Sequence, residues 1–401
     1  MQEDRRLPLE GIRVLEVGEL IAGPFTCTLL GEFGADVIKI ERPKRGDLIR
    51  LFGPQTDGEF VYWSMLARNK KSVVVDLNST AGRAILGDLI RQSDVLMDSL
   101  RPGLFDTWGF DDETLQSMNQ RLITLHVSGF GRTGPYSSRP GYDPVAQAIS
   151  GLSYMTGDPS GPPMRAGGSI PVCDFTTSFL GALGICLAII ERFSSEQGQV
   201  IDVALYDLAF RVLAPLLTLY DRSGEVYGRH GNRSLGGGPT GHFRTKDDTW
   251  LAISIQGDDQ FDRCARAIGR EDWTEKPEYQ TIDSRTIHRE VIDGAMADWV
   301  AVRTAEDVVD KLESNGLVCG VILTPADAAQ DPHLKSRSLH RSGTDGSLLP
   351  WPVPMLSCTP GQSEGRAPDL GEQTAEVLKQ VLGYTDDRVE SLRSAGIIET
   401  L

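Results

Sequence analysis

The first third of the chain alternates between short apolar runs and helical stretches. Residues 12–17 and 37–41 are predicted strands, and the helix between them opens at Gly23–Pro24 and continues to Phe33. A strand, a helix and a second strand at this spacing indicate a right-handed parallel crossover. The alternation continues with predicted strands at 73–77, 95–97 and 122–127 and a helix at 81–91. The pattern therefore predicts an α/β fold with an open parallel sheet and helices on both faces.

Two glycine- and proline-rich stretches interrupt this alternation. Residues 128–142 have little apolar periodicity, and a long loop of this kind inside a compact domain is usually functional. A helix is predicted over 144–152, and a second loop of similar composition runs to residue 171. Asp174 then precedes a strongly apolar helix, predicted over 175–193. Its longest apolar run is about half of a membrane span, so we expect a core helix.

The composition shifts after Gly224, where a flexible stretch with many glycines begins. A strand at 250–255 and helices at 259–268, 288–302 and 305–315 follow, and they predict a second, smaller α/β domain. Residues 370–398 are predicted to be helical and to return to the first domain. The predicted domains are 1–215 for the large domain, 225–325 for the small domain and 330–401 for the returning segment.

Length, charge and cysteine usage narrow the class of protein. With 401 residues, two domains are a reasonable expectation. A net charge of −16 makes the chain a poor candidate for binding nucleic acid or an anionic membrane. The six cysteines form no CxxC pair, which indicates free thiols in a reducing compartment. No signal peptide is recognisable, so we expect a cytoplasmic protein.

Several common catalytic motifs are absent from the sequence. There is no HExxH and no metal-ligand spacing among the six histidines, so no metal is expected. Residues 31–35, Gly-Glu-Phe-Gly-Ala, fail the GxGxxG pattern of a dinucleotide site, and neither a GxSxG nucleophile elbow nor a Walker A sequence is recognised. These absences count against a metalloprotease, a dinucleotide enzyme, a serine hydrolase of the α/β type and a P-loop enzyme.

Asp174 has two readings from its local sequence. Aspartate is a favoured N-cap residue, and capping alone would explain its place before an apolar helix. The second reading is catalytic, because the helix N-terminus is expected to keep the carboxylate ionised and to offer N–H groups to a developing oxyanion. The two roles are compatible.

Two further features also have a structural and a functional reading. The run Gly236, Gly237 and Gly238 is either a plain linker or a lid whose backbone approaches a substrate. The basic cluster that begins at Arg42 follows a predicted strand, and ligands of open α/β sheets bind beyond the carboxyl ends of the strands. A solvated surface patch is the alternative for that cluster.

Four separated segments together resemble the class III CoA-transferases, the CaiB/BaiF family that includes formyl-CoA and carnitine CoA-transferases. Each segment alone is weak, but they follow in order over nearly the whole chain. They are PLEGIRVL (8–15) with AGP (22–24) and GADVIKIERP (34–43); RNKKS (68–72) with RPG (101–103); GFG (129–131) with GYD (141–143); and Asp174 with Gly181 and Gly184.

This resemblance implies a large Rossmann-like domain, a small domain and two chains interlocked as a homodimer. It places the family's nucleophilic aspartate on Asp174. Its carboxylate would attack an acyl-CoA thioester, giving an aspartyl anhydride and then an aspartyl-CoA thioester that passes coenzyme A to a second acid. The family's glycine loop, which shields these intermediates from water, falls on Gly236, Gly237 and Gly238.

The resemblance also implies where coenzyme A, the co-substrate, is bound. Arg42 is a natural phosphate partner, and Val75 and Asn78 fall on the adenine side. Ser99, Arg101 and Tyr142 complete the implied contacts. Three positions depart from the family pattern: Ile21 replaces a glutamine, Ser99 an asparagine and Thr107 an arginine. In addition, a Glu-His pair near the C-terminus of many relatives reads Glu372-Gln373 here. These departures count against the formyl-CoA and oxalate pair in particular.

Two other functions compete with acyl transfer. The α-methylacyl-CoA racemase shares this fold and uses a histidine in a Gly-His-Asp segment, which reads Gly141-Tyr142-Asp143 here. Tyrosine has a much higher ordinary pKa and is a poorer proton shuttle at pH 7. The other alternative is a CoA-binding scaffold without catalysis, which the retained Asp174 and glycine-rich loops argue against.

Overall fold

The computed structural model describes residues 6–56, 58–234, 236–342, 348–363 and 365–401. The chain divides into two compact units. The larger comprises residues 1–152, 165–224 and 332–401, and the smaller comprises 153–164 and 225–331. The segment 153–164, inside the second glycine- and proline-rich stretch, thus belongs with the smaller unit.

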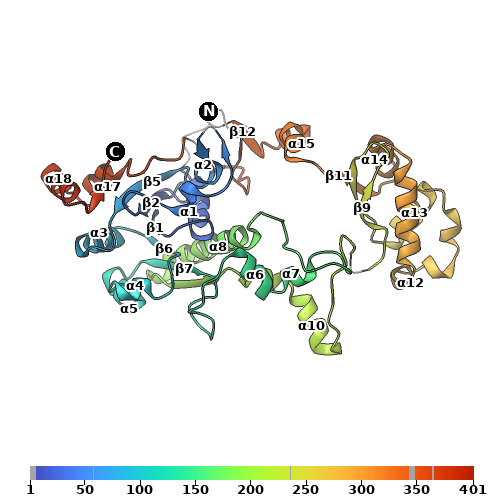
Figure 1. Cartoon of the computed structure of the whole chain (residues 1–401), viewed down its shortest axis with the longest axis horizontal. Helices are drawn as coiled ribbons and strands as arrows, with labels where there is room; N and C mark the ends of the chain where they lie inside the picture. The colour runs from blue at the N-terminus through green and yellow to red at the C-terminus, as the bar shows by residue number, and fades with distance from the viewer. Residues whose placement is uncertain (1–5, 57, 235, 343–347, 364) are drawn as a thin grey trace. The chain divides into compact units, whose positions relative to one another are not determined.

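A seven-stranded sheet forms the centre of the larger unit, in the order β14-β5-β2-β1-β6-β7-β8 (Figure 1). All pairs are parallel except β14 with β5, which is antiparallel. The inner strands are buried on both faces, as expected where helices cover both sides. The strands are β1 Arg13–Val17, β2 Asp36–Glu41, β5 Lys70–Val75, β6 Val95–Asp98, β7 Ile123–Ser128, β8 Val200–Ala204 and β14 Ile398–Glu399.

Alternate residues of these strands belong to two separate apolar cores. In β1, Leu15 and Val17 pack against one group of helices, whereas Val14 packs against the other. The first core contains α3, α4, α5, α17 and α18, and the second contains α1, α6, α8 and α9. Their bounds are α1 Ala22–Glu32, α3 Thr80–Arg91, α4 Leu104–Thr107, α5 Asp112–Met118, α6 Asp143–Ile149, α8 Val172–Ser195, α9 Asp207–Val212, α17 Thr374–Gln380 and α18 Asp386–Ser394.

Shorter elements complete the larger unit and its connections. Two small hairpins lie outside the main sheet, and a 3₁₀ turn follows β2. The remaining elements are η1 Leu48–Leu51, β3 Gln55–Thr56, β4 Glu59–Phe60, α2 Val61–Leu66, α7 Leu152–Met155, α10 Ala214–Ser223, α16 Pro332–Ser336, β12 His340–Ser342 and β13 Leu348–Pro350.

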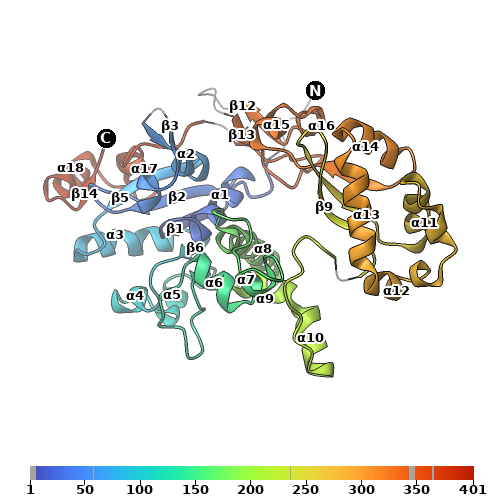
Figure 2. The same ribbon diagram turned by 45° about the vertical axis from the view of Figure 1, so that its right-hand side comes forward.

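The smaller unit has its own core around a three-stranded antiparallel sheet, β11-β10-β9, on which helices pack (Figure 2). Trp273 and Phe261 are stacked inside this core, with ring centroids 5.8 Å apart. The elements are β9 Thr240–Arg244, β10 Trp250–Ser254, β11 Val318–Val321, α11 Asp258–Ala267, η2 Glu271–Thr274, η3 Pro277–Tyr279, α12 Ile282–Ile287, α13 Arg289–Ala301, α14 Ala305–Glu313 and α15 Pro325–Gln330.

Helix α8 differs from its prediction at both ends. It begins at Val172 with Pro171 as its N-cap, so the N-cap reading of Asp174 is wrong: this aspartate is the third residue of the helix. By length and composition α8 could cross a membrane, with a mean hydropathy of 1.8. It is nevertheless built into the larger unit, because the side chains of Thr177 and Arg192 are buried. They donate to the carbonyls of Leu205 and Arg121 in the loops of that unit.

Candidate active site

Asp174 lies in the first turn of α8, where that helix packs on α1. The Ser178 hydroxyl, one turn later, donates to the Ala22 carbonyl at 2.7 Å and the Asp174 carbonyl at 2.9 Å. Phe175 packs edge-on against Phe25 of α1, with ring centroids 5.1 Å apart. These contacts fix the first turn of α8 and hence the backbone that carries the Asp174 carboxyl.

Most N–H groups in this first turn already have partners. Val172 donates to the Ile170 carbonyl, Phe175 to the Pro171 carbonyl and Cys173 to a carboxylate oxygen of Asp143. Within the described residues, only the N–H of Asp174 itself has no partner among the first four. The helix end therefore offers one amide donor to an oxyanion, fewer than the sequence suggested.

A buried carboxylate, Asp143, holds the entrance of α8 in place. One oxygen accepts from the Cys173 N–H at 2.7 Å. The other accepts from Gln147 Nε2 at 2.9 Å and Arg165 Nη2 at 2.8 Å. Gln147 also accepts from the Ala166 N–H, so the loop before α8 is tied to α6. Asp143 thus fixes the position of Asp174 through the peptide that precedes it.

The charge state of Asp174 differs from the expectation of a fully ionised carboxylate. Burial and the negative charge of Asp143, opposed by Arg165, raise the pKa of Asp174 to about 7. Burial in a low-dielectric site outweighs the helix dipole here, whose effect is usually ~0.3–1 kcal/mol. No described donor bonds to this carboxyl in compensation. A more basic carboxylate is also a better nucleophile, which suits covalent catalysis.

Three of the implied CoA contacts line one cavity at the carboxyl edge of the sheet. Arg42, Val75 and Asn78 follow or end adjacent strands and surround a space of ≈ 260 Å³, with Trp108 on the other side. Val75 is buried, whereas Arg42 and Asn78 are exposed at the rim. Such an edge is where open parallel sheets bind ligands. The structure brings these three residues together.

The other three implied contacts line a neighbouring cavity of ≈ 390 Å³. Ser99 and Arg101 follow β6, and Tyr142 comes from the end of the loop after β7. Tyr142 is 65% exposed. Leu100 borders both cavities, so the six residues form two adjoining groups.

A close backbone approach closes the loop that carries Tyr142. A Cβ atom on Gly129 would lie 2.7 Å from the Gly141 Cα, and one on Gly141 would lie 3.0 Å from the Gly129 Cα. Only glycine fits at both positions without moving the backbone. The pair returns residue 142 to the end of β7, beside Ser128.

Arg42 already has a partner in the unliganded structure. Its guanidinium pairs with Glu19, which follows β1 and lines the same cavity. Burial raises the pKa of Glu19, although the charge of Arg42 opposes that shift. A ligand phosphate at this position has to compete with a carboxylate for Arg42. The sequence did not single out Glu19.

The three departures from the family pattern have different surroundings. Ile21 is buried with Ile49 and Leu66 and presents no polar group. Thr107 is exposed and its hydroxyl donates to the Leu104 carbonyl. Neither lines the two cavities, whereas Ser99 does. The Ser99 hydroxyl is buried and has no hydrogen-bond partner in the described part of the chain.

The segment Gly236–Gly238 has a defined conformation in the smaller unit. The Gly237 N–H donates to the Thr286 hydroxyl at 3.1 Å, and the Ser234 hydroxyl donates to the Gly236 carbonyl at 2.9 Å. Gly237 has φ +70°, a left-handed conformation that favours glycine. Within its unit the segment is therefore an ordered loop that is hydrogen-bonded to α12, and this argues against a plain linker.

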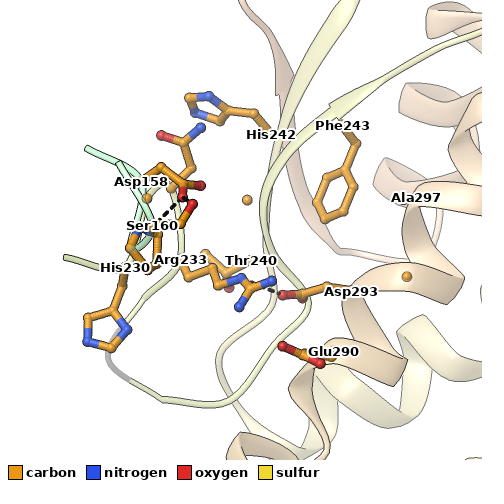
Figure 3. Close-up of a pocket in the computed structure, with 15 residues that line it drawn as sticks. Asp158, Ser160, His230, Arg233, Thr240, His242, Phe243, Glu290, Asp293 and Ala297 are labelled. Carbon is orange, nitrogen blue, oxygen red and sulfur yellow. Dashed lines mark hydrogen bonds and ion pairs between the residues drawn. The ribbon is translucent and has the colours of Figure 1, made fainter. Parts of the chain in front are cut away.

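A further cavity of ≈ 580 Å³ lies wholly within the smaller unit (Figure 3). Arg233 forms an ion pair with Asp293 there at 3.3 Å, and Asp158 and Glu290 add two more carboxylates. None of the residues selected from the sequence lines it. One guanidinium against three carboxylates makes it a poor site for a polyanion such as coenzyme A.

Comparison with known proteins defines the class of enzyme. The chain is 38% identical to the succinyl-CoA–L-malate CoA-transferase beta subunit of Chloroflexus aurantiacus, over 98% of each chain. It is 32% identical to a formyl-CoA:oxalate CoA-transferase of Rhodopseudomonas palustris, over 98% of this chain and 97% of that one. A CAIB/BAIF family protein from Brucella suis superposes with a TM-score of 0.83 at 30% identity, covering 94% of this chain and 100% of that one.

These relatives are transferases that act on CoA thioesters, and the protein is an acyl-CoA:carboxylate CoA-transferase. The model of CoA-transferase family III matches residues 9–374, and the chain belongs to that family. The resemblance noted in the sequence is confirmed, and so is transferase over racemase chemistry. The identity of the acids and the role of each side chain go beyond these matches.

Proposed function

We propose that Asp174 is the covalent nucleophile of the CoA-transferase reaction. The observation that carries this proposal is the state of its carboxyl: half-buried, without a described donor, and with a pKa raised to about 7. A carboxylate kept free of strong donors at a fixed helix position is suited to attack a thioester. Asp143, Gln147 and Arg165 support the position without occupying the reacting oxygens.

The chemistry proceeds in four exchanges without net transfer of a proton or an electron. A carboxylate oxygen of Asp174 attacks the donor thioester carbonyl, the C–S bond breaks, and CoA thiolate leaves an aspartyl anhydride. The thiolate attacks the aspartyl carbonyl and releases the donor acid. The acceptor carboxylate then attacks the aspartyl-CoA thioester, and the thiolate attacks the new acyl group and regenerates Asp174.

For the substrates, we propose succinyl-CoA as donor and a small hydroxydicarboxylic acid as acceptor. Relatives that align over nearly the whole chain transfer coenzyme A from succinyl-CoA to L-malate or to D-citramalate. The departures at Ile21 and Thr107 from the formyl-CoA branch agree with this preference. The proposal concerns the acids only, since the coenzyme A moiety is common to all these enzymes.

Coenzyme A is proposed to occupy the two adjoining cavities at the carboxyl edge of the sheet. Arg42, Val75 and Asn78 would hold the nucleotide end, and Ser99, Arg101 and Tyr142 the chain that leads to the thioester. Gly236, Gly237 and Gly238 would shield the anhydride from water. A phosphate that displaces Glu19 from Arg42 would complete the first group of contacts.

A donor and acceptor screen tests this function. The protein is incubated with succinyl-, acetyl- or formyl-CoA and a panel of mono-, di- and hydroxydicarboxylates, and new CoA thioesters are identified by mass. We expect malyl- or citramalyl-type CoA thioesters from succinyl-CoA and no product from formyl-CoA with oxalate. Transfer confined to monocarboxylates would contradict the proposed substrates while leaving CoA transfer intact.

The same assay in heavy water separates transfer from racemisation. A chiral 2-methylacyl-CoA is added without a free acid, and deuterium at the α carbon is measured. We expect none, because the tyrosine at position 142 is a poor proton shuttle at neutral pH. Incorporation of deuterium without a second acid would establish proton transfer at that carbon instead.

We propose that α8 is covered by a second copy of the chain in a homodimer. Five apolar side chains form a stripe along one side of this helix, spaced by three or four residues, and remain exposed in the single chain. They are Phe179 (46% exposed), Leu183 (55%), Leu187 (57%), Ile190 (65%) and Phe193 (80%).

Replacing Leu187 with lysine tests this interface. A lysine in the middle of the stripe places an unpaired charge against apolar side chains, so we expect light scattering to change from dimer to monomer. Ile287→Lys, at an 80% exposed position of the smaller unit, is the matched control and should remain dimeric. A wild-type chain that is monomeric and sediments with lipid vesicles would contradict the proposal.

We further propose that the protein works in the cytoplasm. All six cysteines are free thiols, three of them buried, which agrees with a reducing compartment. Fractionation of the native cells with antibody detection tests this location.

A further inference from the structure

His126, on β7, bonds to carboxylates through both ring nitrogens. Nδ1 lies 3.0 Å from an oxygen of Asp98, at the end of β6, and Nε2 lies 3.0 Å from an oxygen of Asp112, at the start of α5. The ring is 5% exposed. Nothing in the sequence singled out this histidine, and the proposed transfer chemistry does not use it.

The contacts around the ring determine its charge. The second Asp98 oxygen accepts from the Leu100 N–H at 2.8 Å, and the second Asp112 oxygen accepts from Arg132 Nη1 at 2.5 Å. Ionised carboxylates only accept hydrogen bonds, and a neutral imidazole has a single N–H. Both contacts are satisfied together only when His126 is an imidazolium.

This network joins the two segments that line the second cavity. Asp98 shapes the turn that leads to Ser99 and Arg101 through its bond to Leu100. Arg132 belongs to the loop after β7, and its N–H is held by Asp202 of β8 at 2.9 Å. The two segments follow the paired strands β6 and β7 and both line this cavity. The charged ring adds a side-chain link between them, through Asp98 on one side and through Asp112 and Arg132 on the other.

We propose that His126 is a positioning residue for acyl-CoA binding, whose charged form holds the 99–101 turn and the 128–142 loop in the geometry that accepts the thioester end of the substrate. This inference rests on the proposed CoA site. The charged groups that face the ring or its partners are Asp98 of β6, Asp112 of α5, Arg132 of the loop, Asp106 of α4 and Asp202 of β8.

The direction of the pH effect follows from the surroundings of the ring. Burial opposes the charged form, but the hydrogen bond and negative charge of Asp98 outweigh it and raise the pKa of His126 above its ordinary 6.5. A raised pKa means that the contribution of His126 is complete below 6.5 and is lost as pH rises through the folded-state value. The KM for acyl-CoA is therefore lowest below pH 6.5 and increases as pH rises through the pKa of His126 in the folded protein.

The test compares His126→Gln with the wild type in steady-state kinetics over a pH series, together with CoA binding by calorimetry. We expect the KM for acyl-CoA to rise about tenfold at pH 6.5, since a charge-assisted contact is lost, with kcat at saturation nearly unchanged. The pH dependence of KM should flatten in the variant. Asp112→Asn should raise KM less, and combining it with His126→Gln should add little, because both changes break the same contact.

His333→Gln, at an exposed histidine in α16, is the matched control and should leave every parameter unchanged. A His126→Gln protein with unaltered KM and an unaltered pH profile, or one that only melts at lower temperature, would overturn the proposal. If the wild type transfers no coenzyme A, the calorimetric measurement of CoA binding still tests the proposal. Weaker CoA binding in His126→Gln supports the positioning role of His126, and equal binding contradicts it. Failure of the proposed function is thus distinguishable from failure of this inference.

Discussion

Replacing Asp174 with alanine abolishes acyl exchange while leaving folding and CoA binding largely intact. Loss of a covalent nucleophile removes the step on which both halves of the reaction depend, and we expect kcat to fall by more than about 10⁴-fold. The measurement is formation of the new CoA thioester, with CoA binding followed separately by calorimetry. Intact-mass spectra of the wild type with acyl-CoA alone should show a covalent adduct that the variant lacks.

Asp387→Ala is the matched control for this change. Asp387 also lies in the first turn of a helix, α18, but is exposed and far along the chain from the proposed site. It should retain wild-type activity. An Asp174→Ala enzyme that exchanges acyl groups at the wild-type rate would mean that another residue carries the acyl group.

Replacing Asp174 is also expected to change stability, and here the change is a gain although activity is lost. The carboxyl of Asp174 has a pKa of about 7 against an ordinary 3.8. Since the folded value is the higher one, its favourable contribution is present below 3.8 and is lost as pH rises through about 7. Asp174→Asn should therefore increase the free energy of unfolding at pH 8, by on the order of a few kcal/mol, and have little effect at pH 3.5. The melting temperature at the two pH values measures this change.

Asp143→Asn is expected to have the second largest effect. An amide keeps an oxygen for the Cys173 N–H, but its NH₂ group faces two donors, Gln147 Nε2 and Arg165 Nη2. We expect stability to fall by about 1–3 kcal/mol, the usual cost of a buried unsatisfied group. Loss of the negative charge beside Asp174 also lowers the pKa of the nucleophile, so the acidic limb of the kcat profile should move to lower pH.

Two measurements separate these consequences for Asp143. Chemical denaturation gives the stability loss, and a pH series of kcat between 5 and 8 gives the shift of the acidic limb. Asp111→Asn, at a half-buried N-cap outside the site, should lower stability modestly without moving the limb. An Asp143→Asn enzyme with an unmoved limb would show that Asp143 does not act on the charge of Asp174.

The sequence was a good guide to the larger unit where local signals agreed with burial. The strands β1, β2, β6 and β7 are short runs rich in valine, isoleucine and leucine, and their predicted bounds differ from those observed by one residue at each shifted end. Two strands of the seven-stranded sheet were missed: β8, whose alternation of Val200, Ile201 and Asp202 is weak, and β14, which is only two residues long. Both are sheet-edge strands, so pairing to a neighbour defines them more than their own pattern does.

The candidate site was predictable in its residues and less so in its electrostatics. Arg42, Val75 and Asn78 share one cavity, as do Ser99, Arg101 and Tyr142. The charge of Asp174 could not be read from its neighbours in sequence, because it depends first on burial and then on Asp143, which lies 31 residues earlier and reaches it through the fold. Glu19 and His126 were missed for the same reason: their partners come from other strands.

The position of Leu100, which borders both cavities, has a consequence for inhibitor design. A fragment that fills only one compartment gains only the contacts of that compartment. A short linker over Leu100 would convert the second binding event into an intramolecular one, with an effective concentration in the millimolar range. In the compartment beside Glu19 and Trp108, such a ligand must first open the ion pair between Glu19 and Arg42.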